Sequence, residues 1–273
     1  MIGNQTGGLK NTEEFVKRAG GAPANVAVAA SRLGAQTSIT ASVGNDAFGK
    51  FLIERMRNEN VKINVEQLEE KTTLAFVSLD KQSKPEFSFY RGADEKILHD
   101  IETESDIVHL GSLPLTNQET AENILQTLEN FEGKVSFDPN LRKELVDEEY
   151  IETLENVIKR TDILFAAEEE MNRLGGTDKI LQKVDEVVES RGEEGALVRT
   201  VEDSFKASSP PVEPVDTTGA GDALTGAYLT FREQGKEEAL RKAVHAASLS
   251  IQEKGAMSAL PDKTHLKNSM KDR

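Results

Sequence analysis

Apolar positions along this 273-residue chain follow two different spacings. Helical spacing, with an apolar residue every three or four positions, occurs at 48–56, 121–128, 151–158 and 239–251. Short runs typical of strands accompany them, at 38–43, 107–110, 134–137, 163–165 and 196–198. This alternation predicts an α/β fold, with one mostly parallel central sheet and helices on both of its faces. No low-complexity or Pro/Ser/Gly-rich linker divides the chain, so we expect residues 1–273 to form a single domain.

One stretch departs from this alternation. Residues 72–80 and 85–91 are both strand-like, and the polar residues 81–84 between them are typical of a turn. The pattern predicts a β-hairpin, at about residues 71–91, inserted as a small β lid or as a contact between subunits. An ordinary hairpin at a sheet edge explains it equally well. Its apolar strands would need cover, which favours a homodimer formed through the hairpin.

The composition narrows the classes of partner. Forty-eight acidic residues against 33 basic ones give a net charge of −15, which argues against sequence-independent nucleic-acid binding and against docking on anionic lipid. The absence of cysteine excludes disulfides, thiolate metal sites and thiol catalysis. The longest apolar run, at 26–30, is far too short to cross a bilayer, and no secretory signal is visible. We therefore expect a soluble cytoplasmic protein.

The most informative segment reads Asp-Thr-Thr-Gly-Ala-Gly-Asp, from Asp216 to Asp222, directly before a predicted helix. Because Gly219, Ala220 and Gly221 leave the backbone almost uncovered, their N–H groups can converge on an anion at the positive end of the helix dipole. Asp222 could be an ordinary helix cap. A cap alone, however, does not require a nest of bare N–H groups. Neither the P-loop string nor the dinucleotide-binding fingerprint fits this segment.

A second segment reads Gly-Gly-Ala-Pro-Ala-Asn, from Gly20 to Asn25, and leads into an alanine-rich helix. The two glycines permit a ligand to approach the backbone closely, and the Asn25 amide offers both a donor and an acceptor. Taken alone, the segment is explained as well by a turn and a helix ending at Gly34.

Together these two segments resemble the two signature motifs of the ribokinase-like (PfkB) carbohydrate kinases. The resemblance runs in the right order from about Gly20 to Pro261, and segment 89–94, Phe-Tyr-Arg-Gly-Ala-Asp, looks most like the fructokinase branch. It implies a ribokinase-like fold and transfer of the γ-phosphoryl group of ATP to a sugar hydroxyl. Fructose is the expected acceptor, with ribose or 2-keto-3-deoxygluconate as alternatives.

The resemblance also implies roles for individual residues. Asp222 would be the base that removes a proton from the sugar hydroxyl, and the N–H groups of Gly219, Ala220 and Gly221 would stabilise the migrating phosphoryl group. The residues expected to bind the sugar or phosphates are Gly20, Gly21, Asn25, Tyr90, Arg91, Asn140 and Arg142. Those expected to contact ATP are Ser190, Arg191, Gly192, Gly195, Ala247 and Ser248. The expected ion sites are Glu170, for Mg²⁺ through water, and the backbone near Asp216, Thr218 and Gly255, for a monovalent cation such as K⁺.

Simpler alternatives stay open for several of these residues. Arg142 could be a surface cation, residues 190–195 a plain turn between strands, and Ala247 and Ser248 simple helix packing. The four histidines, including His109, show no zinc-binding spacing and are expected to be structural or exposed.

Several positions depart from the family pattern. Relatives open with an apolar strand that carries a sugar-binding aspartate, whereas this chain shows no such strand and no aspartate before Asp46. Glu189 places a charge in the strand before the 190–195 loop, and Ala167 stands where relatives often have Asn. A second hypothesis therefore stays open: a relative that keeps the fold and nucleotide binding but has little or no catalysis, and acts as a binding or scaffold protein.

Overall fold

The computed structural model describes residues 1–79, 85–98, 100–101, 104–141 and 148–271. Its largest layer is a six-stranded sheet in the order β12-β11-β10-β9-β8-β7. The strands are β7 (Ile107–Gly111), β8 (Lys134–Asp138), β9 (Ile163–Ala167), β10 (Glu186–Ser190), β11 (Ala196–Arg199) and β12 (Ser204–Ala207). Strands β7 to β10 are parallel, and β11 and β12 extend the sheet in antiparallel pairing. The predicted mostly parallel sheet is confirmed.

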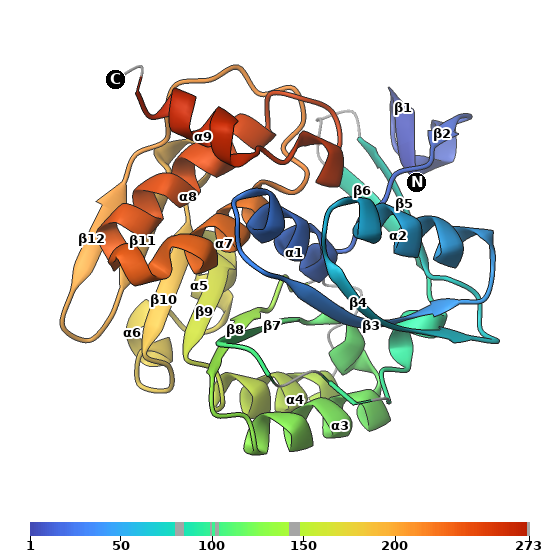
Figure 1. Cartoon of the computed structure of the whole chain (residues 1–273), viewed down its shortest axis with the longest axis horizontal. Helices are drawn as coiled ribbons and strands as arrows, with labels where there is room; N and C mark the ends of the chain where they lie inside the picture. Colours follow the sequence, from blue (N-terminus) through green and yellow to red (C-terminus); the bar gives the residue numbers. More distant parts are fainter. Residues whose placement is uncertain (80–84, 99, 102–103, 142–147, 272–273) are drawn as a thin grey trace.

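Helices cover both faces of this sheet (Figure 1). On one face lie α7 (Ala220–Phe231), α8 (Lys236–Ser250) and α9 (Lys263–Ser269), and on the other α3 (Gln118–Glu129) and α4 (Glu148–Ile158), while the short helices α5 (Glu168–Arg173) and α6 (Thr177–Ile180) follow β9. Neighbouring strand residues point to opposite faces, so Val188 packs with α7 and α8 while Val187 packs with α3 and α4. No helix in the described part of the chain is long and apolar enough to cross a membrane.

The expected single central sheet is divided on one side. Strands β3 (Ser38–Gly44) and β4 (Lys62–Leu68) pair in parallel as a separate two-stranded sheet. Helix α1 (Ala22–Arg32) contacts both β3 and β7, and α2 (Ala47–Asn58) packs on β3 and β4. Within the described ranges no strand lies between β3 and β7. The apolar side chains of Ile39, Ala41 and Val43 on β3 consequently stay only half-buried.

A third, four-stranded sheet in the order β2-β1-β5-β6 forms what we call the lid sheet. Strands β5 (Leu74–Leu79) and β6 (Pro85–Tyr90) are the predicted hairpin, whose turn at 81–84 lies outside the described residues. Strand β1 (Ile2–Thr6) pairs in parallel with β5, and β2 (Phe15–Val16) pairs in antiparallel with β1. The chain therefore opens with a strand that the sequence pattern did not predict, but β1 is polar and pairs within the lid sheet, so it is not the apolar, aspartate-bearing core strand of relatives. These residues form a strand because the lid sheet offers backbone partners: the terminal ammonium of Met1 donates to the Ala75 carbonyl at 2.8 Å.

The sequence-based doubt about the strand before the 190–195 loop was wrong, since β10 lies inside the main sheet. Its two buried carboxylates have partners. The Tyr228 hydroxyl donates to Glu186 Oε1 at 2.7 Å, and Arg191 Nε donates to Glu189 Oε1 at 2.7 Å. A paired and hydrogen-bonded carboxylate can be buried at far lower cost than an isolated one.

Candidate active site

A cavity of about 730 Å³ opens where the carboxyl ends of β7 to β10 meet the amino-terminal ends of α1 and α7. The lid sheet covers it with Val77, Phe87 and Phe89. This is the edge of a parallel sheet at which ligands gather. Of the residues expected to bind substrates, the structure brings Gly20, Gly21, Asn25, Asn140, Glu170, Ser190, Thr218, Gly219, Gly221 and Asp222 to its wall.

Asp222 is the third residue of α7, and its side chain is held inside the protein, with 9% of the residue exposed. Asn25, near the start of α1, donates from Nδ2 to Asp222 Oδ2 at 2.7 Å. The bond is possible because α1 and α7 pack closely: a Cβ on Gly226 would lie 2.6 Å from the Ala29 Cβ. Asn25 Oδ1 is buried and has no hydrogen-bond partner among the described residues, so it can accept a bond from a ligand.

The backbone before Asp222 is open, as the motif predicts. Gly219 caps α7 with a φ of 84°, a left-handed conformation that favours glycine, and a Cβ there would lie 2.8 Å from the Ala256 Cβ. A Cβ on Gly221 would meet nothing within 4 Å. The Ala220 N–H donates to the Thr217 carbonyl at 3.3 Å, but the N–H groups that begin a helix have no acceptor within it. The amino-terminal end of α7 can therefore receive an anion.

The three positions expected near a monovalent cation lie together. Asp216 accepts a hydrogen bond from the Thr218 N–H at 3.0 Å and another from the Gly255 N–H at 2.9 Å. The carboxylate thus joins the loop before α7 to the loop after α8.

Glu170 joins two other segments of the cavity wall. Its Oε1 accepts a hydrogen bond from the Leu141 N–H at 2.5 Å, and its Oε2 accepts one from the Ala167 N–H at 3.1 Å, at the start of α5. Asn140 adopts a φ of 40° and donates from its N–H to Asp138 Oδ1 at 3.1 Å. Asp138, Asn140 and Glu170 all line the cavity.

Two of the expected sugar or phosphate ligands, Tyr90 and Arg91, are not on the cavity wall, and a third cannot be placed. Tyr90 is 65% exposed and is not part of the cavity wall. The Arg91 guanidinium donates to Asp94, to the Thr116 hydroxyl and to the Leu113 carbonyl, and Arg91 is not part of the cavity wall, although Asp94 and Leu113 are. Arg142 lies outside the described residues. The roles of these three residues stay predictions.

Of the residues expected to contact ATP, some lie on the cavity wall and others do not. Ser190 ends β10 at the cavity, whereas Arg191 turns back to Glu189. Gly192 and Gly195 have φ values of 55° and 96°. A Cβ on Gly195 would lie 2.0 Å from the Ala207 carbonyl oxygen, so this glycine is required by the contact with β12.

On α8, Ser248 is buried, with its hydroxyl 3.0 Å from that of Ser209 and donating to the Val244 carbonyl at 2.9 Å. Its neighbour Ala247 packs against the apolar core beneath α7 and α8. Neither residue reaches the cavity wall. Helix packing, the simpler alternative, is therefore enough to account for small residues at positions 247 and 248. Their contact with ATP stays a prediction.

His109 is a cavity residue that sequence reasoning set aside. It lies on β7 and lines the cavity, with its ring edge-to-face on Phe165 at 6.3 Å between centroids. Its Nδ1 is 2.9 Å from the Ser136 hydroxyl oxygen. Burial lowers the pKa of His109 to about 4, so the imidazole is neutral near pH 7. The sequence signal that could have pointed to His109 is its position as the one polar residue in the apolar run 107–110.

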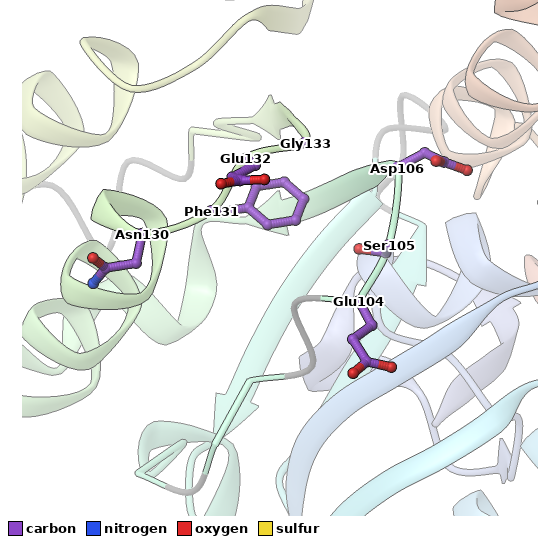
Figure 2. A pocket seen from close by; sticks show the side chains of 7 residues that line it. All are labelled: Glu104, Ser105, Asp106, Asn130, Phe131, Glu132 and Gly133. Atoms are coloured by element: carbon purple, nitrogen blue, oxygen red, sulfur yellow. The ribbon is translucent and has the colours of Figure 1, made fainter.

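A smaller cavity of about 490 Å³ lies at the opposite ends of β7 and β8, between residues 104–106 and 130–133. Figure 2 shows that the carboxylates of Glu104 and Asp106 point in different directions. No group of three or more His, Cys, Asp or Glu side chains suited to a metal ion occurs in the part of the chain that the structure describes.

Comparison with known proteins decides the family. Residues 1–263 match the family model described as pfkB family carbohydrate kinase. The chain belongs to this family. It is 36% identical over 275 residues to a Pyrococcus horikoshii protein described as a putative sugar kinase, a match that covers 94% of the chain and 88% of the relative.

Two solved structures extend the family comparison to bound ligands. An E. coli protein described as a ribokinase II, in complex with ATP and Mg²⁺, superposes with a TM-score of 0.88 at 27% identity, over 100% of this chain and 96% of that one. A Vibrio cholerae fructokinase double mutant, with fructose, ADP and a potassium ion bound, superposes with a TM-score of 0.83 at 28% identity, over 98% and 94% of the two chains. The ribokinase-like fold is thereby established, and the pfkB chain is a sugar kinase.

Proposed function

We propose that this pfkB kinase transfers the γ-phosphoryl group of ATP to a hydroxyl of a small sugar, with fructose as the acceptor. The observation that carries the proposal is the buried carboxylate of Asp222, bonded to Asn25 and placed beside the uncovered backbone of Gly219 and Gly221. The fructose-bound relative supports the choice of acceptor.

In this mechanism Asp222 takes the proton of the sugar hydroxyl. The sugar oxygen then bonds to the γ-phosphorus of ATP as the bond between this phosphorus and the ADP oxygen breaks. The N–H groups of Gly219 and Gly221, at the positive end of α7, stabilise the negative charge on the migrating group. Asn25 holds the Asp222 carboxylate in place by donating from Nδ2, and its Oδ1 accepts a hydrogen bond from a hydroxyl of the sugar.

The donor groups in the cavity suit Mg²⁺ bound mainly by phosphate and water. Glu170 and Asp138 are carboxylates on the cavity wall, and they do not form an all-protein cage among the described residues. When bound, Mg²⁺ neutralises charge on the ATP phosphates. Glu170 would orient its water ligands, and backbone carbonyls near Asp216, Thr218 and Gly255 would hold K⁺. The ATP–Mg²⁺ and potassium complexes of relatives support both assignments.

A coupled assay of ADP release tests the function, with fructose, ribose and 2-keto-3-deoxygluconate as acceptors. We expect turnover on fructose, and a loss of at least about 10²-fold in kcat for Asp222→Asn with the circular dichroism spectrum unchanged. Asp178→Asn is the control, because Asp178 is an exposed acid paired with Arg199 at 2.7 Å. If the Asp222→Asn variant turns over at the wild-type rate, Asp222 is not the base.

The division between β3 and β7 favours one competing function. A protein with an incomplete sheet beside the sugar site could bind ATP as a scaffold without transferring phosphate. ATP binding by calorimetry, together with no ADP release on any of the three sugars, would support the scaffold and contradict the kinase proposal.

A further inference from the structure

Both ends of the β5–β6 hairpin leave the body of the protein at one place, which we call the lid root (residues 71–73 and 91–94). The Ala93 N–H donates to the Lys71 carbonyl at 2.9 Å, and the Thr73 hydroxyl donates to Asp94. Arg91 Nε donates to the same Asp94 carboxylate at 3.0 Å. These bonds hold the two halves of the lid root to each other.

A second set of bonds joins the lid root to the start of α2 through Asp46. Asp46 Oδ1 accepts the N–H groups of Phe48 and Gly49, both at 2.9 Å, as a helix cap does. The same carboxylate accepts two bonds from Thr72, from its N–H to Oδ2 at 2.9 Å and from its hydroxyl to Oδ1 at 2.8 Å. A helix cap needs only the bonds from Phe48 and Gly49. The two bonds from Thr72 therefore serve to hold the lid root.

Asp46 keeps its charge in this position. Burial by itself would raise the pKa of Asp46, but the hydrogen bonds from Thr72, Gly49 and Phe48 outweigh it and hold the pKa at about 2. The carboxylate is therefore ionised at any pH at which a kinase would be assayed, and its bonds to Thr72 are charge-assisted.

Packing leaves the lid root little room to move. Thr72 is 5% exposed, and its hydroxyl oxygen accepts the Gly44 N–H at 3.0 Å. A Cβ on Gly44 would lie 2.5 Å from both the Glu70 carbonyl oxygen and the Thr72 nitrogen. A Cβ on Gly49 would lie 2.1 Å from the Gly44 carbonyl oxygen. The lid root can shift only if the bonds to Asp46 break.

The strands that start at the lid root form part of the wall above the candidate active site. Val77 on β5 and Phe87 and Phe89 on β6 line the cavity that holds Asp222. Asp46 itself does not reach the cavity. The direction in which β5 and β6 leave the body therefore decides where this apolar wall lies relative to a bound sugar.

We propose that Asp46 is a positioning residue, which holds the lid sheet over the acceptor sugar by its two bonds to Thr72. The proposal rests on the kinase function proposed above. Loss of these bonds lowers the fraction of molecules with the lid sheet in place, and the apparent affinity for the sugar falls by the same factor. The base and the anion-binding backbone are untouched, so kcat and the KM for ATP change little.

Two variants separate the lid root from the helix cap. Thr72→Val removes the hydroxyl, keeps the shape of the side chain and leaves the cap of α2 intact. Asp46→Asn removes the negative charge that both caps α2 and holds the lid root. Asp262→Asn is the matched control, because Asp262 caps α9 by accepting the N–H groups of Thr264 and His265, both at 2.8 Å, far from the lid sheet in the chain.

We expect the KM for the sugar to rise roughly tenfold in Thr72→Val and Asp46→Asn, with kcat within about twofold of wild type and the KM for ATP unchanged. Asp262→Asn should change the KM for neither substrate. Hydrogen exchange of residues 72–79 and 85–92 should become faster in the first two variants only. Wild-type values of both the sugar KM and this exchange in Thr72→Val and Asp46→Asn would overturn the proposal.

Failure of the kinase function would look different. In that case wild-type protein releases no ADP with any of the three sugars. The exchange measurement, which needs no substrate, then decides the role of Asp46: faster exchange of the lid strands supports it, and unchanged exchange contradicts it.

Discussion

At the scale of single residues, Gly219 and Gly221 have opposite reasons to be glycine. Gly219 has a φ of 84° and lies against Ala256, whereas Gly221 faces open space. We expect Gly219→Ala to lower the free energy of unfolding by about 1–2 kcal/mol, because of the left-handed backbone. Gly221→Ala should keep its stability and lose at least about tenfold in kcat, since the methyl group enters the space for the phosphoryl group.

Urea denaturation and ADP release, measured on the same preparations, check this pair. Each variant is the control for the other, because both add one methyl group to the same turn. Wild-type kcat in Gly221→Ala would contradict the placement of the phosphoryl group at this end of α7.

Residues inside compact motifs could be placed from the sequence, and residues outside them could not. Asn25 and Asp222 are 197 positions apart, yet each lies in the first turn of a helix that a glycine caps, and the structure joins them by a hydrogen bond. His109 belongs to no motif, so only the position of β7 beside the cavity reveals it. Arg91 was also expected from a motif to reach the sugar; in the structure it pairs with Asp94, three residues away, and its contact with the sugar stays a prediction.

At the scale of elements, the contact between β10 and α7 combines apolar packing with one buried hydrogen bond. Burial is the main cause that raises the pKa of Tyr228, and the nearby charge of Glu186 raises it further. The hydroxyl therefore stays protonated and donates to Glu186 Oε1. Glu186 is 1% exposed, and Arg232 lies 3.4 Å from it. We expect Tyr228→Phe to lower the free energy of unfolding by about 1–3 kcal/mol, because a buried carboxylate loses a donor.

Urea denaturation of the single and double variants measures this effect. In a Glu186→Gln background the cost of Tyr228→Phe should be smaller, since a neutral amide loses less than a carboxylate when its donor is removed. Equal costs in both backgrounds would show that Tyr228 stabilises the contact by packing alone.

Elements with a continuous apolar pattern were predicted, and elements that depend on distant backbone partners were not. Strands β7, β8 and β9 match the predicted runs closely. Strand β1 is glycine-containing and polar, and it exists because β5, about 70 residues away, offers its edge. Strand β10 carries two glutamates whose partners lie on α6, α7 and the loop after the strand, which no local pattern reveals.

At the scale of the whole molecule, the lid sheet has two faces with different surroundings. Its inner face closes the cavity, while Phe15, Phe76 and Tyr90 form an aromatic cluster with ring centroids 5.0 and 5.5 Å apart. Tyr90 is 65% exposed, and none of the three lines the cavity. This cluster is the surface through which we expect the homodimer predicted from the hairpin to form, because exposed aromatic side chains are enriched at such interfaces.

We predict twice the monomer mass by light scattering at micromolar concentration. The net charge of −15 opposes association of two copies, so higher salt should strengthen the dimer by screening this repulsion. Tyr90→Glu should give a monomer, since it places a charge in the cluster. Val201→Glu adds the same charge at a residue that is 82% exposed on the β11–β12 turn, and should leave the dimer intact. A monomeric mass for the wild type at all salt concentrations would reject the dimer, and equal dissociation by both variants would place the interface elsewhere.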